Sequence, residues 1–177
     1  MTTRIKMICF DMDGTIADLY KVENWLTKLR EYDPSPYTEA YPMWHMGELA
    51  RVLEMLKVQG IEIRVVTWLS KDSTPEYKKA VRKAKREWLE SYGFPFDFFH
   101  GIQYGRTKAD AIRNYLKENE EAILIDDNEQ VRKGWTKGRT IDPTTCNLIE
   151  VLNALVKWGH SIKLLLTTDK FYDIIII

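Results

Sequence analysis

A chain of 177 residues is long enough for one complete hydrophobic core and too short for two ordinary domains, so we expect a single domain over residues 1–177. The 26 basic residues equal the 26 acidic ones, which excludes a general electrostatic attraction to nucleic acid or to a membrane surface. Two cysteines are too few for a disulfide framework, and neither a signal peptide nor a stretch of about 18 apolar residues is present, so we expect a cytoplasmic protein.

The first apolar run, residues 5–10, leads directly into Asp11 and Asp13, which are followed by Gly14. A glycine lets the chain leave strand geometry, so the two aspartates can turn toward one point. Two carboxylates at one point repel each other, and a hard cation that takes oxygen ligands, above all Mg²⁺, relieves this repulsion. The stretch therefore predicts a functional site. The simpler alternative is an acidic turn that caps a helix over residues 15–17.

The residues after this site predict helices separated by a rigid break. Apolar residues at helical spacing predict a helix over residues 19–32, which ends at the turn-rich segment 33–36. Residues 37–46 are rich in aromatic side chains and have little periodicity. A second helix is predicted over residues 47–58, and Gly60 is its expected C-cap.

The second strand is predicted over residues 61–66 and ends at Thr67. A parallel crossover between two strands needs only a dozen or so residues, whereas roughly fifty separate this strand from the first. We therefore expect an insertion over residues from about 18 to 45, a small helical cap that covers the site.

The rest of the chain alternates helices with short strands. The predicted elements are a helix over 75–92, a strand over 99–103, a helix over 106–119, a strand over 122–125, a turn or short helix up to Gly134, a weak strand over 139–141 and a helix over 144–158. Such alternation predicts an α/β fold with a doubly wound parallel sheet, in which ligands bind beyond the carboxyl ends of the strands. Residues 161–177 break the pattern and predict an added hairpin.

The helix over 75–92 carries a dense set of basic side chains opposite its apolar stripe. These residues are Lys78, Lys79, Arg82, Lys83, Lys85 and Arg86. We interpret them as a solvated face; the alternative is a surface for a polyanion, but no aromatic residue is interleaved there to stack on a base.

Polar residues follow four of the predicted strands. They are Asp11 and Asp13 after the first, Thr67 after the second, Lys108 in the helix after the third, and Asp126 with Asp127 after the fourth. The order apolar strand, Asp, any residue, Asp, Gly, Thr resembles the first signature of the haloacid dehalogenase (HAD) superfamily, whose members are mostly phosphatases and phosphotransferases. The whole set, over residues 5–127, is similar to the four motifs of that superfamily in their usual order.

This resemblance implies a role for each residue. Asp11 would be the nucleophile that forms an acyl phosphate, and Asp13 the general acid and then the general base. Mg²⁺ would be held by Asp11, the main-chain carbonyl of Asp13 and Asp126, with Asp127 beside the metal or Lys108. The phosphate would meet Lys108, Thr67, the N–H of Trp68 and the loop at Gly14. For Asp127, the alternative is an N-cap of the helix that follows.

The substrate is predicted from a weaker likeness and from the composition of the cap. The segment from Thr67 to Gly93 and the sequence LIDDN resemble the cytosolic 5′(3′)-deoxyribonucleotidase branch, although that branch has a small residue where Trp68 stands. The aromatic side chains of the cap are as a set candidates to stack on a base, and Tyr20, Tyr41 and Trp44 are singled out among them. The other members of this set are Trp25, Tyr32 and Tyr37. We therefore expect a small phosphorylated molecule as the partner, with a nucleoside monophosphate favoured over a sugar phosphate.

The sequence disfavours three alternatives to phosphatase activity. Dehalogenases of the superfamily lack an acid at the position of Asp13, which disfavours carbon–halogen chemistry. A phosphoacceptor receiver domain would carry its acceptor aspartate after the third strand, where this sequence has none. A homologue that only binds phosphate would usually have lost one of the key residues, and Asp11, Asp13, Lys108 and Asp126 are all present.

Overall fold

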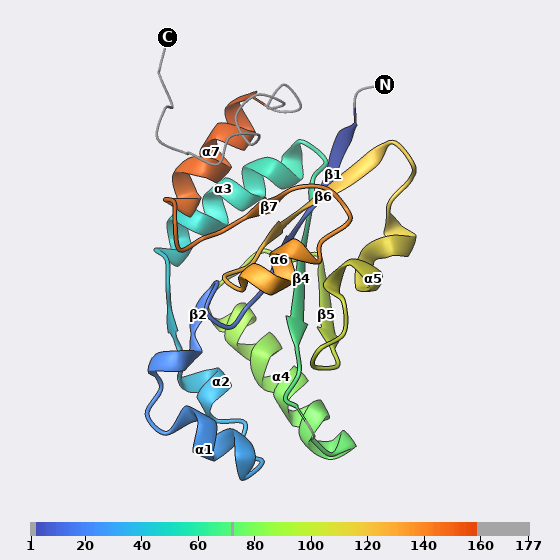
Figure 1. Ribbon diagram of the computed structural model, residues 1–177. Helices are drawn as coiled ribbons and strands as arrows, with labels where there is room; N and C mark the ends of the chain where they lie inside the picture. The colour runs from blue at the N-terminus through green and yellow to red at the C-terminus, as the bar shows by residue number, and fades with distance from the viewer. Residues whose placement is uncertain (1–2, 72, 159–177) are drawn as a thin grey trace.

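Five parallel strands form the central sheet of the computed structural model, which describes residues 3–71 and 73–158 (Figure 1). Their order across the sheet is β5-β4-β1-β6-β7. The strands are β1 (Arg4–Phe10), β4 (Glu62–Trp68), β5 (Phe98–Ile102), β6 (Glu120–Ile125) and β7 (Thr140–Ile141). The chain leaves β1 toward one edge and later returns to its other side, so the predicted doubly wound parallel sheet is confirmed.

Helices cover both faces of this sheet. The helices α3 (Met46–Val58), α4 (Pro75–Ser91) and α7 (Leu148–Trp158) pack on one face, against Ile8 of β1 and Ile123 of β6 among others. The short α5 (Lys108–Ile112), the 3₁₀ helix η2 (Arg113–Tyr115) and α6 (Glu129–Lys133) follow the strands on the other side, where Met7 and Leu124 are buried. Strand segments buried on both faces are continuous apolar runs, as residues 7–10 of β1 and 122–125 of β6 are.

A bulge in β1 sets which of its side chains face which core. Ile5 pairs with Glu121 and Met7 with Ala122, so Lys6 is an extra residue without a partner on β6. Ile5 and Ile8 consequently face the same core although they are three residues apart. Beyond the bulge the register is regular up to Phe10, which places Asp11 directly at the carboxyl end of the sheet.

The insertion after β1 is held by a two-residue antiparallel ladder between β2 (Ala17–Asp18) and β3 (Tyr41–Pro42). We call the residues between these strands, 19–40, the cap. It contains the 3₁₀ helix η1 (Leu19–Lys21), α1 (Trp25–Arg30) and α2 (Pro36–Glu39). These short elements lie beside α4 in Figure 1.

The cap packs on the N-terminal half of α4 through a small core of its own. This core comprises Leu19, Tyr37, Leu69, Tyr77, Val81 and Ala84. Two hydrogen bonds tie cap backbone to the helix: the indole of Trp88 donates to the Ala40 carbonyl at 2.7 Å, and the hydroxyl of Tyr77 donates to the Asp33 carbonyl at 2.9 Å. The helix thus supports both the sheet and the cap.

Several predicted boundaries were wrong. The single helix over residues 19–32 is instead η1 and α1, separated by Asn24 in the left-handed region at φ 56°, a conformation that asparagine tolerates. The helix over 106–119 is shorter, because the chain becomes extended at Leu116 and packs that side chain against the core below α5. The helix over 144–158 begins at Leu148, and the second strand continues through Thr67 to Trp68.

The predicted hairpin over residues 161–177 lies outside the described residues. Among the helices that the structure describes, none combines the length and the apolar character that crossing a membrane requires.

Candidate active site

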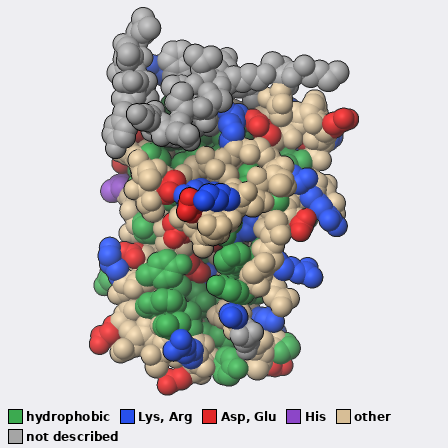
Figure 2. Space-filling model, in the orientation of Figure 1, with side chains coloured by type: hydrophobic (Ala, Val, Ile, Leu, Met, Phe, Trp, Pro, Cys, Tyr) green, Lys and Arg blue, Asp and Glu red, His purple; other side chains and the backbone are tan. Residues whose placement is uncertain are grey.

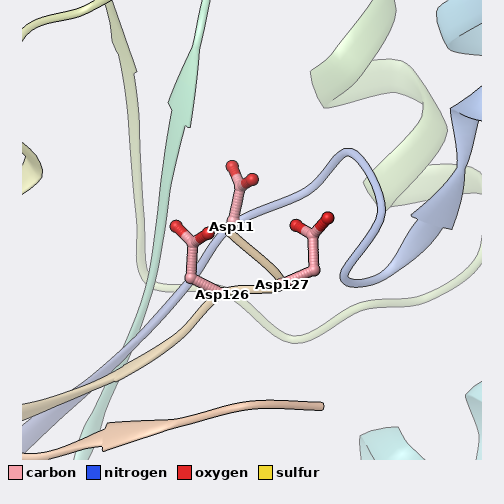
Figure 3. A group of neighbouring side chains, drawn as sticks. All are labelled: Asp11, Asp126 and Asp127. Atoms are coloured by element: carbon pink, nitrogen blue, oxygen red, sulfur yellow. The ribbon is translucent and has the colours of Figure 1, made fainter. Parts of the chain in front are cut away.

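Two neighbouring strands end in aspartates at the same edge of the sheet. Asp11 follows β1 and Asp126 follows β6, and the backbone N–H of Asp11 donates to the Ile125 carbonyl at 2.9 Å. Carboxylate oxygens of Asp11, Asp126 and Asp127 lie within 4.8 Å of one another, and their side chains point to the same side of the chain (Figure 3). The strand order reverses at β1, so this cluster occupies the point where parallel α/β sheets bind ligands.

A buried lysine lies within the cluster. The ammonium of Lys108, at the start of α5, donates to Asp11 Oδ1 and to Asp126 Oδ2, each at 2.7 Å. Burial alone would lower the pKa of Lys108, but the charges of Asp11 and Asp126 outweigh it and raise that pKa. Lys108 is therefore a fixed positive charge beside two carboxylates.

Three carboxylates and one ammonium leave an excess of negative charge in the cluster. Burial, followed by the charge of Asp11, raises the pKa of Asp126 to about 6, and the same two causes raise the pKa of Asp127. Carboxylate oxygens gathered at one point are the donors that Mg²⁺ prefers, and a divalent cation would remove the repulsion that raises these pKa values. The residues present therefore fit a magnesium ion.

The loop between β1 and β2 holds Asp127 in place through hydrogen bonds with Thr15. The Met12 carbonyl accepts hydrogen bonds from the N–H groups of residues 15–17, which makes a tight turn and not the capped helix considered as an alternative. Thr15 Oγ1 accepts from the N–H of Asp127 at 3.1 Å and donates to its Oδ1 at 3.2 Å. Asn128, not Asp127, caps α6 by accepting from Gln130 N–H. The N-cap alternative for Asp127 is therefore wrong.

Gly14 is required by its conformation and by its surroundings. Its φ is +77°, and a Cβ atom there would lie 2.6 Å from Asp127 Oδ2 and 2.7 Å from Tyr20 Cε2. Only a glycine lets the backbone pass this close to the carboxylate cluster.

Asp13 is not one of the three clustered carboxylates and pairs instead with Lys85, which the sequence pattern had assigned to solvent. Lys85 of α4 is fully buried, and its ammonium donates to Asp13 Oδ2 at 2.6 Å, Thr67 Oγ1 at 2.8 Å and the Trp68 carbonyl at 2.9 Å. Burial raises the pKa of Asp13, while the charge of Lys85 opposes this. The interpretation of the whole basic run as a solvated face was wrong at this position.

The helical spacing of α4 indicates that Lys85 is buried. It lies four residues after Val81 and four before Leu89, both of which are buried, so it belongs to the apolar stripe of α4. A lysine on such a stripe needs a buried acceptor, and Asp13 is that acceptor.

A cleft of about 520 Å³ has the four aspartates of the site in its lining. Trp68 lines one side and packs on Tyr104 with ring centroids 4.9 Å apart, and its indole donates to the Arg106 carbonyl. The cap contributes further aromatic side chains to the lining. Among them, the rings of Tyr20 and Trp25 contact each other, with centroids 5.3 Å apart. Figure 2 shows hydrophobic side chains gathered on the half of the molecule that holds the cap.

Of the three cap residues singled out to stack on a base, the structure brings Tyr20 to the cleft, and the other cap aromatics Trp25, Tyr32 and Tyr37 also line it. Tyr41 is 77% exposed and does not line it. The indole of Trp44 donates to the Thr15 carbonyl at 2.7 Å and packs against the main core. The sequence pattern did not show that Tyr41, on β3, lies outside the cleft, nor that Tyr104 lines it.

Neither a protein-family model nor a curated protein sequence matches this chain. Among solved structures, a Mesorhizobium loti protein described as a HAD-like phosphatase aligns over 88% of this chain and 87% of its own, with a TM-score of 0.52 and 14% identity. A chain of the Pnkp1/Rnl/Hen1 RNA repair complex aligns over 80% of this chain with a TM-score of 0.50 and 18% identity. This chain spans only 44% of that one.

A D,D-heptose 1,7-bisphosphate phosphatase from Burkholderia thailandensis aligns over 77% of this chain and 92% of its own, with a TM-score of 0.40 and 12% identity. At these identities the likeness concerns the fold. The α/β fold expected from the sequence agrees with this likeness to the Mesorhizobium loti structure.

Replacing Gly14 by alanine should destabilise the protein more than the same change at Gly93. Both glycines have positive φ, which costs an alanine roughly 1–2 kcal/mol, but nothing lies within 4 Å of a Cβ at Gly93. Urea unfolding should show an additional loss of about 1 kcal/mol or more for Gly14→Ala, from the contact with Asp127. Equal losses for the two variants would contradict the close approach seen here.

The raised pKa of Asp126 predicts a pH-dependent response to magnesium. Its folded-state pKa of about 6 exceeds the ordinary value of 3.8 for an aspartate, so its contribution to stability is present at low pH and is lost as pH rises through 6. Because Mg²⁺ binds the deprotonated cluster, the rise in Tm on adding Mg²⁺ should be larger at about pH 7.5 than at about pH 5.

Thermal unfolding with and without a chelator measures this difference. In Asp126→Asn the pH dependence of the magnesium effect should shrink, whereas the exposed Asp110→Asn should behave like the unaltered protein. A magnesium effect of the same size at both pH values would show that Asp126 does not titrate in this range.

Proposed function

We propose that this protein is a Mg²⁺-dependent phosphomonoester hydrolase that works through a phosphoryl group on Asp11. The observation that carries this proposal is the ammonium of Lys108 at 2.7 Å from both Asp11 and Asp126, within a cluster of three carboxylates. A carboxylate nucleophile, a fixed cation and a set of hard oxygen ligands then stand at one point. Phosphoryl transfer needs this combination and little else from a protein.

Asp11, Asp126 and the main-chain carbonyl of Asp13 would hold the magnesium ion, with Asp127 beside it. The ion supplies positive charge to the oxygens of the phosphoryl group. Lys108 supplies a second positive charge from the protein side. The Thr67 hydroxyl, the Trp68 N–H and the backbone at Gly14 are the remaining proposed contacts of the phosphate.

The reaction divides into two displacements at phosphorus. In the first, an Asp11 oxygen attacks phosphorus, the bond from phosphorus to the leaving oxygen breaks, and Asp13 gives its proton to that oxygen. In the second, the Asp13 carboxylate takes a proton from water as the water oxygen attacks the same phosphorus, which releases inorganic phosphate and restores Asp11. Burial raises the pKa of Asp13, which favours a carboxyl that can carry this proton.

The aromatic cleft supports a nucleoside monophosphate as the substrate. Trp68 and Tyr104 on one part of its lining, and Tyr20 and Trp25 of the cap on another, offer faces on which a base can stack. A stacked base contributes about 1–3 kcal/mol, which corresponds to a preference of roughly tenfold or more over a substrate without a ring system. A sugar phosphate is the alternative substrate.

Hydrolysis of a generic aryl phosphate should require a divalent cation. With Mg²⁺ the purified protein should release the phenolate, and excess chelator should abolish this because the carboxylates then repel the phosphate. Asp11→Asn keeps the shape of the side chain and loses the nucleophile, so turnover should fall by at least about a thousandfold while thermal unfolding remains cooperative. Activity that survives in chelator would contradict the metal assignment.

Comparison of substrates of similar leaving-group pKa tests the nucleotide proposal separately. We expect kcat/KM for deoxynucleoside monophosphates to exceed that for hexose phosphates by about tenfold or more. Tyr104→Ala should reduce this preference, whereas Tyr41→Ala, outside the cleft, should retain it. Equal or higher efficiency on the sugar phosphates would favour the alternative substrate and leave phosphatase activity itself intact.

A further inference from the structure

Lys85 is a buried cation whose three protons all have acceptors. Its ammonium donates to a carboxylate oxygen of Asp13, to the Thr67 hydroxyl and to the Trp68 carbonyl, at distances between 2.6 and 2.9 Å. The side chain has no exposed surface, and the ring of the cap residue Tyr37 lies 4.8 Å from the ammonium. A lysine donates at most three hydrogen bonds, so this geometry is fully satisfied.

Stability alone does not explain a lysine at this position. A buried ion pair loses the hydration of both charges, and well-packed apolar residues of similar volume often serve a core equally well. The neighbours of Lys85 on the inner face of α4, Val81, Ala84 and Leu89, are such residues. The feature that distinguishes Lys85 is its set of partners, since Asp13 lines the cleft and the fully buried Thr67 is the second-last residue of β4.

We propose that Lys85 is a positioning residue that holds the Asp13 carboxylate and the Thr67 hydroxyl in the geometry that phosphoryl transfer requires. This inference rests on the proposed function, in which Asp13 carries the proton and Thr67 meets the phosphate. Lys85 acts from α4, outside the strand ends that supply the other site residues. It joins the loop after β1 to the end of β4.

The two oxygens of Asp13 have different roles in this arrangement. Oδ2 is held by Lys85 at 2.6 Å, whereas Oδ1 is buried and has no hydrogen-bond partner among the described residues. Fixing Oδ2 sets the rotation of the carboxylate and leaves Oδ1 for proton exchange with the substrate. Thr67 Oγ1 accepts the hydrogen bond from Lys85, so this bond fixes the hydroxyl oxygen without using its proton.

The test compares Lys85→Met with Lys83→Met, a lysine on the same helix whose side chain is 74% exposed. Steady-state kinetics are measured with Mg²⁺ on an alkyl and an activated aryl phosphate. In Lys85→Met, kcat should fall about 10- to 100-fold more on the alkyl ester, which needs a proton on its leaving oxygen, than on the aryl ester. KM should change little, and Lys83→Met should match the unaltered protein.

A double-mutant cycle shows whether Lys85 acts through Asp13. In an Asp13→Asn background, Lys85→Met should cause little further loss of kcat on the alkyl ester, because the group that it positions is already absent. Additive losses would overturn the proposal. A uniform rise in KM with unchanged leaving-group dependence would also overturn it, since Lys85 would then bind the phosphate directly.

A second variant and an NMR measurement do not depend on the folding of Lys85→Met. Lys85→Gln keeps a hydrogen-bond donor without the charge and should retain more alkyl esterase activity than Lys85→Met wherever both can be compared. In the unaltered protein, NMR should detect a Lys85 ammonium protected from solvent exchange, and Asp13→Asn should shift it. Absence of a protected ammonium would overturn the positioning role, whereas lack of activity in the unaltered protein would contradict the proposed function itself.

Discussion

The repulsion among four aspartates at one edge of the sheet is the constraint on which the rest of this structure depends. Asp11, Asp126 and Asp127 bring their carboxylates within 4.8 Å of one another, and Asp13 lies two residues from the first. Two buried lysines meet part of this charge, Lys108 from α5 and Lys85 from α4. A fold with these aspartates and without nearby cations would protonate them or lose stability.

The two lysines divide the cluster into halves with different chemistry. Lys108 joins Asp11 and Asp126, the proposed nucleophile and metal ligand, into one unit that would receive phosphate and magnesium together. Lys85 holds Asp13 apart from them, so that the group proposed to carry the proton is not drawn into the metal site. The helices α4 and α5 thus contribute one cation each, Lys85 and Lys108. Both cations pair with aspartates that follow β1, the strand that neighbours β6 at the switch point of the sheet.

The sequence predicted the features that depend on local pattern. The run into Asp11, the pair Asp126 and Asp127, and the alternation of strands and helices identified the sheet and the edge at which its polar residues gather. Lys85 was missed because a run of basic residues was assigned to solvent as a whole, without working out which face of the helix each residue occupies. Its acceptor Asp13 is also 72 residues away in the sequence. The break at Asn24 was missed because the apolar spacing continues through this residue, whose left-handed conformation leaves no mark on that pattern.

Trapping a phosphoryl mimic on the nucleophile tests the central claim most directly. Beryllofluoride binds an aspartate nucleophile in place of the phosphoryl group, so a crystal structure of the protein with Mg²⁺ and beryllofluoride identifies that residue. We expect beryllium bonded to an oxygen of Asp11, a magnesium ion between Asp11 and Asp126, and fluorine atoms facing Lys108 and Thr67. Beryllofluoride on another residue, or a magnesium ion that does not contact Asp11 and Asp126, would contradict the account.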